Sequence, residues 1–94
     1  MDTGLAGKNV LITGASRNMG RLAAIQFAKE GANLAICTST KMKELDEVAA
    51  ELRTIGVKVH AARCDVANKA DVAVFVREAQ AALGSIDVAI NNAV

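Results

Sequence analysis

A glycine turn follows the first apolar run of the chain and has the spacing of a phosphate-binding loop. Residues 10–12 are Val-Leu-Ile, and the turn after them reads Gly14-x-x-x-Asn18-x-Gly20. Glycine lets a backbone approach a ligand closely, and the free N–H groups of a following helix face an anion. Asparagine is the non-glycine residue that most readily adopts positive φ, so Asn18 suits such a turn. The stretch predicts a dinucleotide pyrophosphate site, with a nucleotide-free βα-turn as the alternative.

Such a turn needs a strand before it and a helix after it, and the chain repeats that alternation. Apolar runs and helical periodicity predict strands at residues 8–13, 33–38, 57–64 and 86–91 and helices at 18–30, 41–55 and 68–83. Right-handed crossovers then favour a three-layer α/β fold with a parallel sheet ordered 3-2-1-4, truncated after the fourth strand. The strand order reverses between strands 1 and 4. Ligands bind at such a switch point, at the carboxyl ends of the strands.

The helices show the apolar stripes that a core requires. In the second helix the stripe follows i, i+3, i+4, i+7 and consists of Leu45, Val48, Ala49 and Leu52. Asn68 is expected to cap the third helix, with Asp71 in an approximate capping-box position.

Residues 57–64 alternate between apolar and polar, which is typical of an edge strand, and His60 lies on the polar side. We therefore expect His60 to be a solvated strand residue.

Length and composition exclude several classes of function. Ninety-four residues make at most one small domain, spanning residues 1–94, and the net charge of +1 is spread without a basic block, which argues against nucleic-acid binding. No apolar run reaches the roughly 20 residues of a membrane span, and the N-terminus lacks a basic segment typical of secretion signals. Cys37 and Cys64 lie in apolar strands without metal-ligand spacing. These features predict a cytoplasmic protein with reduced core thiols and no metal site.

Four features in order resemble the N-terminal half of a short-chain dehydrogenase/reductase with its Rossmann-like fold. They are the glycine turn, with Asn18 at the family's middle glycine, the Asp after the third strand, the run Ile-Asp-Val-x-x-Asn-Asn-Ala, and the spacing between them; together they cover residues 8–93. The family's motif continues Asn-Asn-Ala-Gly, whereas Val94 stands at that last position. The resemblance implies a partial dinucleotide-binding domain.

The resemblance also implies roles for individual residues. Groups around the turn would hold the pyrophosphate and the adenosine ribose, namely Gly14, Ser16, Arg17, Asn18, Met19 and Gly20. Asp65 would accept a hydrogen bond from the adenine amino group, and Val66 would pack beside the ring. Asn92 would lie by the cofactor ribose, and its run would brace the sheet.

The end of the second strand favours NADP over NAD as the cofactor. NAD-binding folds place an Asp or Glu there for the ribose 2′-hydroxyl, whereas this chain has Thr38, Ser39, Thr40 and Lys41. Arg17 lies where NADP-dependent members of the family carry a basic residue. Hydroxyls and a guanidinium suit a phosphate dianion, so Ser39 and Arg17 are the expected readers of the 2′-phosphate. An exposed turn arginine without a ligand is the alternative for Arg17.

The family's catalytic Tyr-x-x-x-Lys and its partner Ser lie beyond the Asn-Asn-Ala run, and this sequence contains no tyrosine. We therefore expect no catalytic residue here, and no oxidoreductase activity from this polypeptide alone. The open fourth strand predicts pairing with a missing C-terminal half or self-association. The leading hypothesis is the cofactor-binding half of an NADP-dependent oxidoreductase. The alternatives are a non-catalytic nucleotide-binding or assembly module and another Rossmann-like enzyme, such as a methyltransferase, although the latter's acidic residue after strand 2 is absent.

Overall fold

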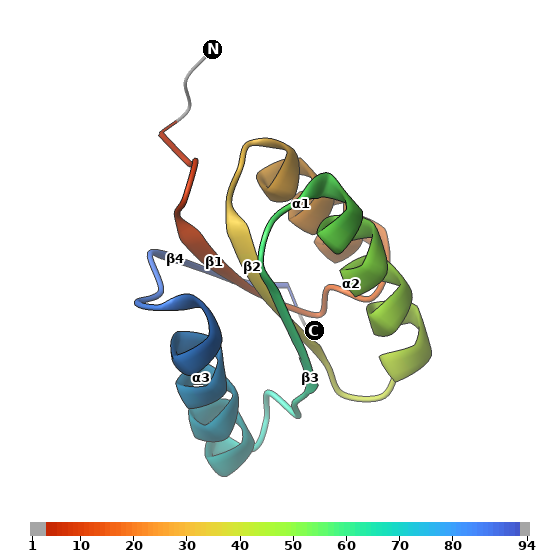
Figure 1. Ribbon diagram of the computed structural model, residues 1–94. Coiled ribbons are helices and arrows are strands. Elements are labelled where there is room, and N and C mark those ends of the chain that lie inside the picture. Colours follow the sequence, from red (N-terminus) through yellow and green to blue (C-terminus); the bar gives the residue numbers. More distant parts are fainter. Residues whose placement is uncertain (1–3, 93–94) are drawn as a thin grey trace.

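The computed structural model describes residues 4–92, which alternate between strands and helices (Figure 1). The elements are β1 (Asn9–Thr13), α1 (Asn18–Lys29), β2 (Asn33–Thr38), α2 (Met42–Ile55), β3 (Val59–Arg63), α3 (Lys69–Leu83) and β4 (Val88–Asn91). Every predicted element is present, and its ends lie within two residues of the expected ones. Boundary residues differ because they leave or enter the glycine and polar turns between elements.

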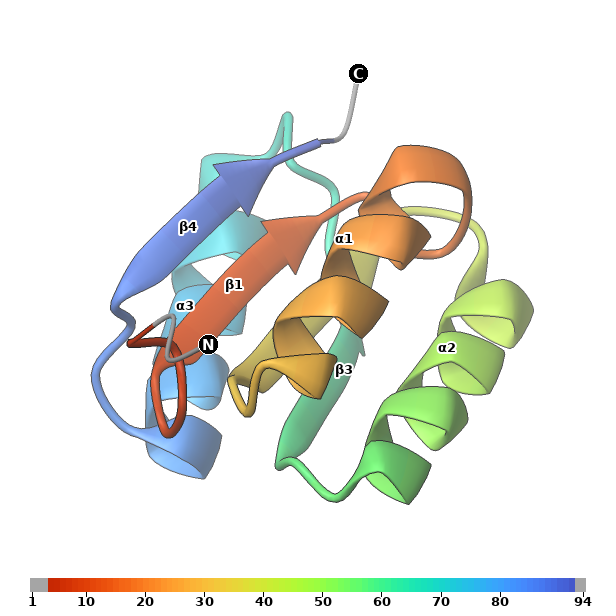
Figure 2. The ribbon, with the colours of Figure 1, turned by 90° about the horizontal axis from the view of Figure 1, so that it is seen from above.

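The four strands form one parallel sheet in the order β3-β2-β1-β4, which confirms the predicted topology. Val10 of β1 is in register with Leu34 of β2 and with Val88 of β4. Helices α1 and α2 cover one face of the sheet and α3 covers the other, giving three layers (Figure 2). β3 and β4 are the two edge strands. β2 and β3 are added on one side of β1 and β4 on the other, so the strand order reverses between β1 and β4.

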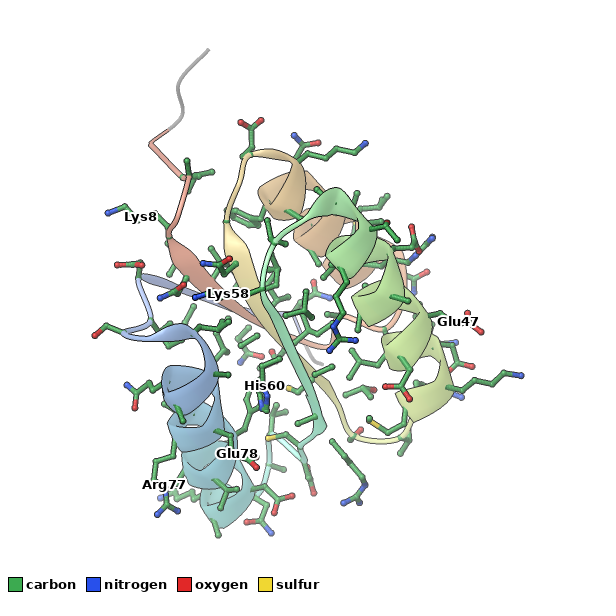
Figure 3. The ribbon with its side chains drawn as sticks, viewed as in Figure 1. Lys8, Glu47, Lys58, His60, Arg77 and Glu78 are labelled. Carbon is green, nitrogen blue, oxygen red and sulfur yellow. The ribbon has the colours of Figure 1, made fainter. Side chains whose placement is uncertain are left out.

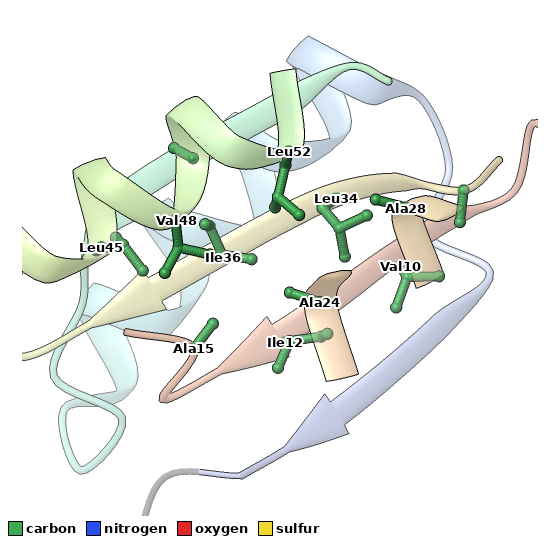
Figure 4. Packing of buried hydrophobic residues seen from close by; sticks show 12 residues of the cluster. Val10, Ile12, Ala15, Ala24, Ala28, Leu34, Ile36, Leu45, Val48 and Leu52 are labelled. Atoms are coloured by element: carbon green, nitrogen blue, oxygen red, sulfur yellow. The ribbon is translucent and has the colours of Figure 1, made fainter. Parts of the chain in front are cut away.

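The core is mainly aliphatic, with Phe75 and the two cysteines on the α3 side, and it lies on both faces of β1 and β2. Val10 and Ile12 of β1 point toward α1 and α2, whereas Leu11 between them points toward α3. The predicted stripe of α2 is buried, as Figure 4 shows for Leu45, Val48 and Leu52 against β2. Alternation of side chains along a strand explains why these buried strands read as continuous apolar runs. Full burial of each Leu or Ile contributes roughly 1.5–3 kcal/mol, so this double packing fixes the sheet that carries the turn.

His60 is not the solvated residue that the polarity pattern predicted. Its ring stacks on Phe75 of α3 with a centroid distance of 5.9 Å, and its Nε2 is buried with no hydrogen-bond partner in residues 4–92. Figure 3 shows the side chain between β3 and α3. The register pairs His60 with Ala35, which faces α3, so the pleat turns His60 to that face as well. The alternation in the sequence identified the strand face of His60, but the covering helix α3 leaves the residue half-buried and its Nε2 fully buried.

The start of α3 confirms one half of the predicted capping box and corrects the other. The Asn68 Oδ1 accepts hydrogen bonds from the backbone N–H groups of Ala70 (3.0 Å) and Asp71 (3.2 Å). The Asp71 carboxylate accepts from the N–H of Asp65 at 3.2 Å instead of returning to Asn68, whose N–H donates to the Asp65 carbonyl at 2.9 Å. Asp71 therefore ties the loop after β3 to α3.

A polar network that periodicity did not indicate joins the amino ends of the strands. The Asn9 Nδ2 donates to the carbonyls of Leu83 (3.0 Å) and Ser85 (2.9 Å), and its Oδ1 accepts from the Asn33 side chain at 3.1 Å. The Asn9 backbone N–H donates to the Asp87 carboxylate at 2.8 Å. Asn9 is 8% exposed, so these bonds largely replace water and fix the connection between α3 and β4.

We expect Asn9→Ala to lower the free energy of unfolding by about 2–4 kcal/mol, because it leaves partly buried acceptors without their donor. Urea unfolding followed by far-ultraviolet circular dichroism measures this loss. Asn68→Ala is the matched control, since it removes an exposed helix cap and should cost about 1 kcal/mol. Equal losses for the two variants would show that the Asn9 network does not hold the connection in place.

Candidate cofactor-binding site

The carboxyl ends of β1, β2 and β3 surround a cavity of about 510 Å³. Its lining includes eight of the predicted site residues: Gly14, Ser16, Arg17, Asn18, Ser39, Asp65, Val66 and Asn92. Met19 and Gly20 lie outside it, because Met19 is on the exposed side of α1 and Gly20 is buried under the turn. The cavity lies beside the point where the strand order changes direction, as the topology predicts.

The turn between β1 and α1 adopts the conformation that its residues predict. Asn18 has φ 58°, the only positive φ among the non-glycine residues in the described part of the chain, and Gly14 has φ 66°. The N–H groups of Gly14 and Ala15 donate to the Cys37 carbonyl at 3.0 and 3.2 Å, which fixes the turn on β2. No side chain caps the start of α1, so its first-turn N–H groups and its dipole are directed at the turn. This is the backbone arrangement that binds phosphates.

Asn92 braces the turn from β4. Its Nδ2 donates to the Gly14 carbonyl at 3.2 Å, and its N–H donates to the Thr13 hydroxyl at 3.0 Å. A Cβ built on Gly20 would lie 2.7 Å from the Asn92 Nδ2 and closer still to the Gly14 carbonyl oxygen. Gly20 is therefore required for close packing of α1 under the turn rather than for a special φ. Val94, which stands at the family's glycine position, lies outside the described residues.

The two loops opposite the turn supply side chains of opposite charge. The buried Thr38 hydroxyl accepts from the Lys41 N–H at 3.2 Å and so fixes the path of Ser39 and Thr40 along the cavity. Across from them, the Asp65 Oδ1 accepts from the Ala67 N–H at 3.0 Å, which holds the loop that carries Val66. The β2 side thus offers hydroxyls, N–H groups and one cation, Lys41, and the β3 side offers the carboxylate of Asp65.

Both cysteines are free thiols, and the structure places them at the base of this cavity as well as in the core. Cys37 is fully buried and Cys64 is 2% exposed. Burial raises the pKa of the Cys37 thiol to about 12, and burial also raises the pKa of Cys64. A buried neutral thiol is a poor nucleophile, so the two side chains line the site without reacting in it. Sequence analysis found their burial but missed this position, because it depends on how β2 and β3 end.

The raised pKa of Cys37 predicts a loss of stability in alkali. Between pH 9.0 and about 12 the unfolded thiol is ionised whereas the folded thiol stays protonated. The native state then binds more protons than the unfolded state, so stability falls as pH rises, by at most about 1.4 kcal/mol per pH unit for one group. Urea unfolding at several values between pH 8.5 and 11 is expected to show a shallower decline in the free energy of unfolding for Cys37→Ala than for the original protein. Parallel declines would contradict the assignment.

A membrane span or a metal site would each leave a recognisable pattern in residues 4–92. None of the helices in this part of the chain is long and apolar enough to cross a membrane. The same residues contain no group of three or more His, Cys, Asp or Glu side chains placed to hold a metal ion.

Comparisons with known proteins agree with this geometry. A family model described as short chain dehydrogenase matches residues 8–94. The chain is 37% identical over 86 residues to the 3-oxoacyl-acyl-carrier-protein reductase FabG of Staphylococcus aureus, covering 92% of this chain and 35% of that protein. It is 41% identical over 91 residues to the ketoacyl reductase HetN of a Nostoc species, covering 97% of this chain and 31% of that protein.

Solved structures show the same arrangement of strands and helices. A short-chain dehydrogenase/reductase variant from Serratia marcescens superposes with a TM-score of 0.91 at 34% identity, covering 95% of this chain and 36% of that one. An NAD⁺-bound xylitol dehydrogenase superposes with a TM-score of 0.90 at 32% identity, covering 95% of this chain and 34% of that one. The chain thus spans about a third of the length of its relatives. It belongs to the short-chain dehydrogenase family, and its four strands are part of that family's Rossmann-like, cofactor-binding fold.

Proposed function

We propose that this chain is the cofactor-binding half of an NADP-dependent short-chain oxidoreductase that transfers hydride between a carbonyl and an alcohol. One observation carries the proposal: the uncapped start of α1, the Arg17 turn and a β2 end without a carboxylate all meet at one cavity. When bound there, the nicotinamide cofactor would supply or accept the hydride. The names of the similar proteins, two of which are ketone-type reductases, support the carbonyl class.

The described residues fit a dinucleotide by their chemistry. The first-turn N–H groups of α1 would receive the pyrophosphate, with Gly14 and Ser16 bringing the backbone close. Asp65 and Val66 would hold the adenine, through a hydrogen bond to its amino group and through contact with the ring. Asn92, which braces the turn, would lie by a cofactor ribose, and the backbone of Met19 in the first turn of α1 would face the pyrophosphate.

The choice of NADP rests on the side chains around the expected 2′-phosphate. Ser39, Thr40 and Lys41 follow β2 and line the cavity together with Arg17. A phosphate dianion is favoured by a guanidinium and by hydroxyl donors, whereas NAD selectivity uses a carboxylate at this strand end. The NAD⁺-bound relative shares the fold, so the fold alone does not choose between the cofactors.

Complete catalysis would need groups from outside this sequence. The family's general acid is a tyrosine, and these 94 residues contain none. We propose that a C-terminal half or a second copy of the chain pairs with β4, an edge strand whose Val88 and Ile90 are half-buried. A cytoplasmic location, with neither a membrane nor nucleic acid as partner, is part of the same proposal. A non-catalytic nucleotide-binding or assembly module remains the alternative because of the missing tyrosine.

Calorimetric titration with NADPH and, in parallel, NADH tests the proposal. The chain has no tryptophan, so heat is a better signal than intrinsic fluorescence. We expect saturable NADPH binding that is about tenfold or more tighter than NADH binding, a difference worth about 1.4 kcal/mol. Arg17→Gln should remove most of that difference and weaken NADH binding much less than NADPH binding. Tighter binding of NADH would refute the NADP assignment, and no binding by a folded chain would favour the assembly module.

A further inference from the structure

A second cavity, of about 310 Å³, lies between the start of α1 and α2. It shares Ser16 and Arg17 with the first cavity, so Arg17 lies on the boundary between the two. The remaining lining residues belong to α1 and to one face of α2: Arg21, Glu44, Glu47, Val48 and Glu51. One guanidinium therefore has hydroxyls and Lys41 on one side and carboxylates on the other.

The charges in this second cavity do not all have partners. Arg21 forms an ion pair with Glu51, with its Nε 3.2 Å from the Glu51 Oε1. Within residues 4–92, no hydrogen bond or ion pair engages the side chains of Arg17, Glu44 or Glu47. Arg17 and Glu47 are exposed and Glu44 is half-buried, so rotation of the long Arg17 side chain can bring its charge toward either cavity. The unpaired cation thus has two unpaired carboxylates within its own cavity wall.

Two anions would compete for this one guanidinium when a 2′-phosphorylated dinucleotide binds. In the empty site, attraction to Glu44 and Glu47 favours Arg17 positions on the α2 side. A 2′-phosphate would draw Arg17 toward Ser39 and would itself be repelled by the same carboxylates. A ligand without the 2′-phosphate would neither compete as strongly for Arg17 nor be repelled as strongly by the carboxylates. The two glutamates should therefore weaken the binding of NADPH and have little effect on the binding of NADH.

We infer that Glu44 and Glu47 are specificity-determining residues that limit the preference of this site for a 2′-phosphorylated dinucleotide by competing for Arg17. The inference deepens the proposed function and rests on it. It assigns these residues a role that the cofactor-binding motif does not contain, because they lie on α2 and face the turn only in the folded protein.

The test is calorimetric titration of NADPH and NADH into Glu44→Gln, Glu47→Gln and the double variant. The double variant should bind NADPH about 3–10-fold more tightly at low salt, with less than about twofold change for NADH. Glu78→Gln is the matched control for each single variant: it also removes one negative charge, but Glu78 is exposed on α3, on the opposite side of the sheet from Glu47 (Figure 3). It should leave both affinities unchanged. Thermal unfolding of each variant establishes that it is folded.

A double-mutant cycle with Arg17→Gln isolates the competition. In that background the Glu44→Gln/Glu47→Gln pair should keep only the smaller part of its effect on NADPH that comes from direct repulsion of the phosphate, because no guanidinium is left to compete for. Three results would each overturn the inference while the proposed function stands. The glutamate variants could keep the original ratio of NADPH to NADH affinity, or they could bind NADH as much more tightly as NADPH. The glutamate substitutions could also have their full effect on NADPH affinity in the Arg17→Gln background. Failure of the folded original protein to bind NADPH would instead overturn the proposed function, and the inference with it.

Discussion

Replacing Gly20 with alanine is expected to abolish cofactor binding and to lower the free energy of unfolding by about 3 kcal/mol or more. The added Cβ would lie 2.7 Å from the Asn92 Nδ2 and 3.0 Å from the Ala15 Cα, with the Gly14 carbonyl closer still. Two of these neighbours are backbone atoms of the turn, and the third, the Asn92 Nδ2, is hydrogen-bonded to the Gly14 carbonyl. None of them can move without displacing the turn. Relief of the clash requires α1 to shift away from β1 and β4, which separates the helix start from the phosphate position.

Gly56→Ala is the control for this substitution. Gly56 has φ 106° and nothing within 4 Å of an added Cβ, so alanine there introduces backbone strain without a clash. We expect it to cost about 1–2 kcal/mol and to leave NADPH affinity intact, because Gly56 lies at the far end of α2 from the cavity. Urea unfolding and calorimetric titration of both variants measure the two effects. A folded Gly20→Ala protein with the original affinity would show that close packing under the turn is not needed for binding.

Replacing Ser39 with aspartate is expected to reverse the cofactor preference. Ser39 is exposed at the end of β2 and lines the cavity with Arg17. A carboxylate at this strand end accepts hydrogen bonds from a ribose 2′-hydroxyl and repels a 2′-phosphate. NADPH affinity should fall about 30-fold or more while NADH affinity rises several-fold, since like charges brought together in an interface cost several kcal/mol.

The same calorimetric titrations measure this reversal, with Ser39→Asn as the matched control. Asparagine has the shape of aspartate but no charge, so its effect on NADPH should be several times smaller. Because Ser39 is exposed, neither variant is expected to change the unfolding midpoint beyond the usual small range for surface substitutions. If Ser39→Asp lowered the affinities for NADPH and NADH equally, residue 39 would serve to shape the loop and would not contact the 2′-hydroxyl or 2′-phosphate of the cofactor.

Local patterns in the sequence were enough to predict the elements, their order and the turn. The apolar runs that became β1 and β2 are buried on both faces, and the α2 stripe from Leu45 to Leu52 packs as its period requires. Asn18 was predicted to accept positive φ, and it has φ 58°. These features depend on neighbouring residues and on local backbone sterics, so they are readable without a tertiary structure.

Tertiary structure decided where polar and reactive side chains lie. His60 was predicted to be solvated, but α3 covers it because the register places it opposite Ala35. The Asn9 bonds to Leu83 and Ser85 join residues more than 70 positions apart, and no periodicity records such a contact. The cavity likewise forms only when parallel strands bring their carboxyl ends to one edge.

The charges around Arg17 show the same division. The sequence alone predicted that the turn and the β2 end act together on a phosphate, because both follow strands in an order that this fold uses. Glu44 and Glu47 look like ordinary exposed residues of an amphipathic helix until α2 packs beside α1 and places them in the wall of the Arg17 cavity. Local residue types determine what each side chain can bind, whereas the packing of distant elements determines which charges compete for it.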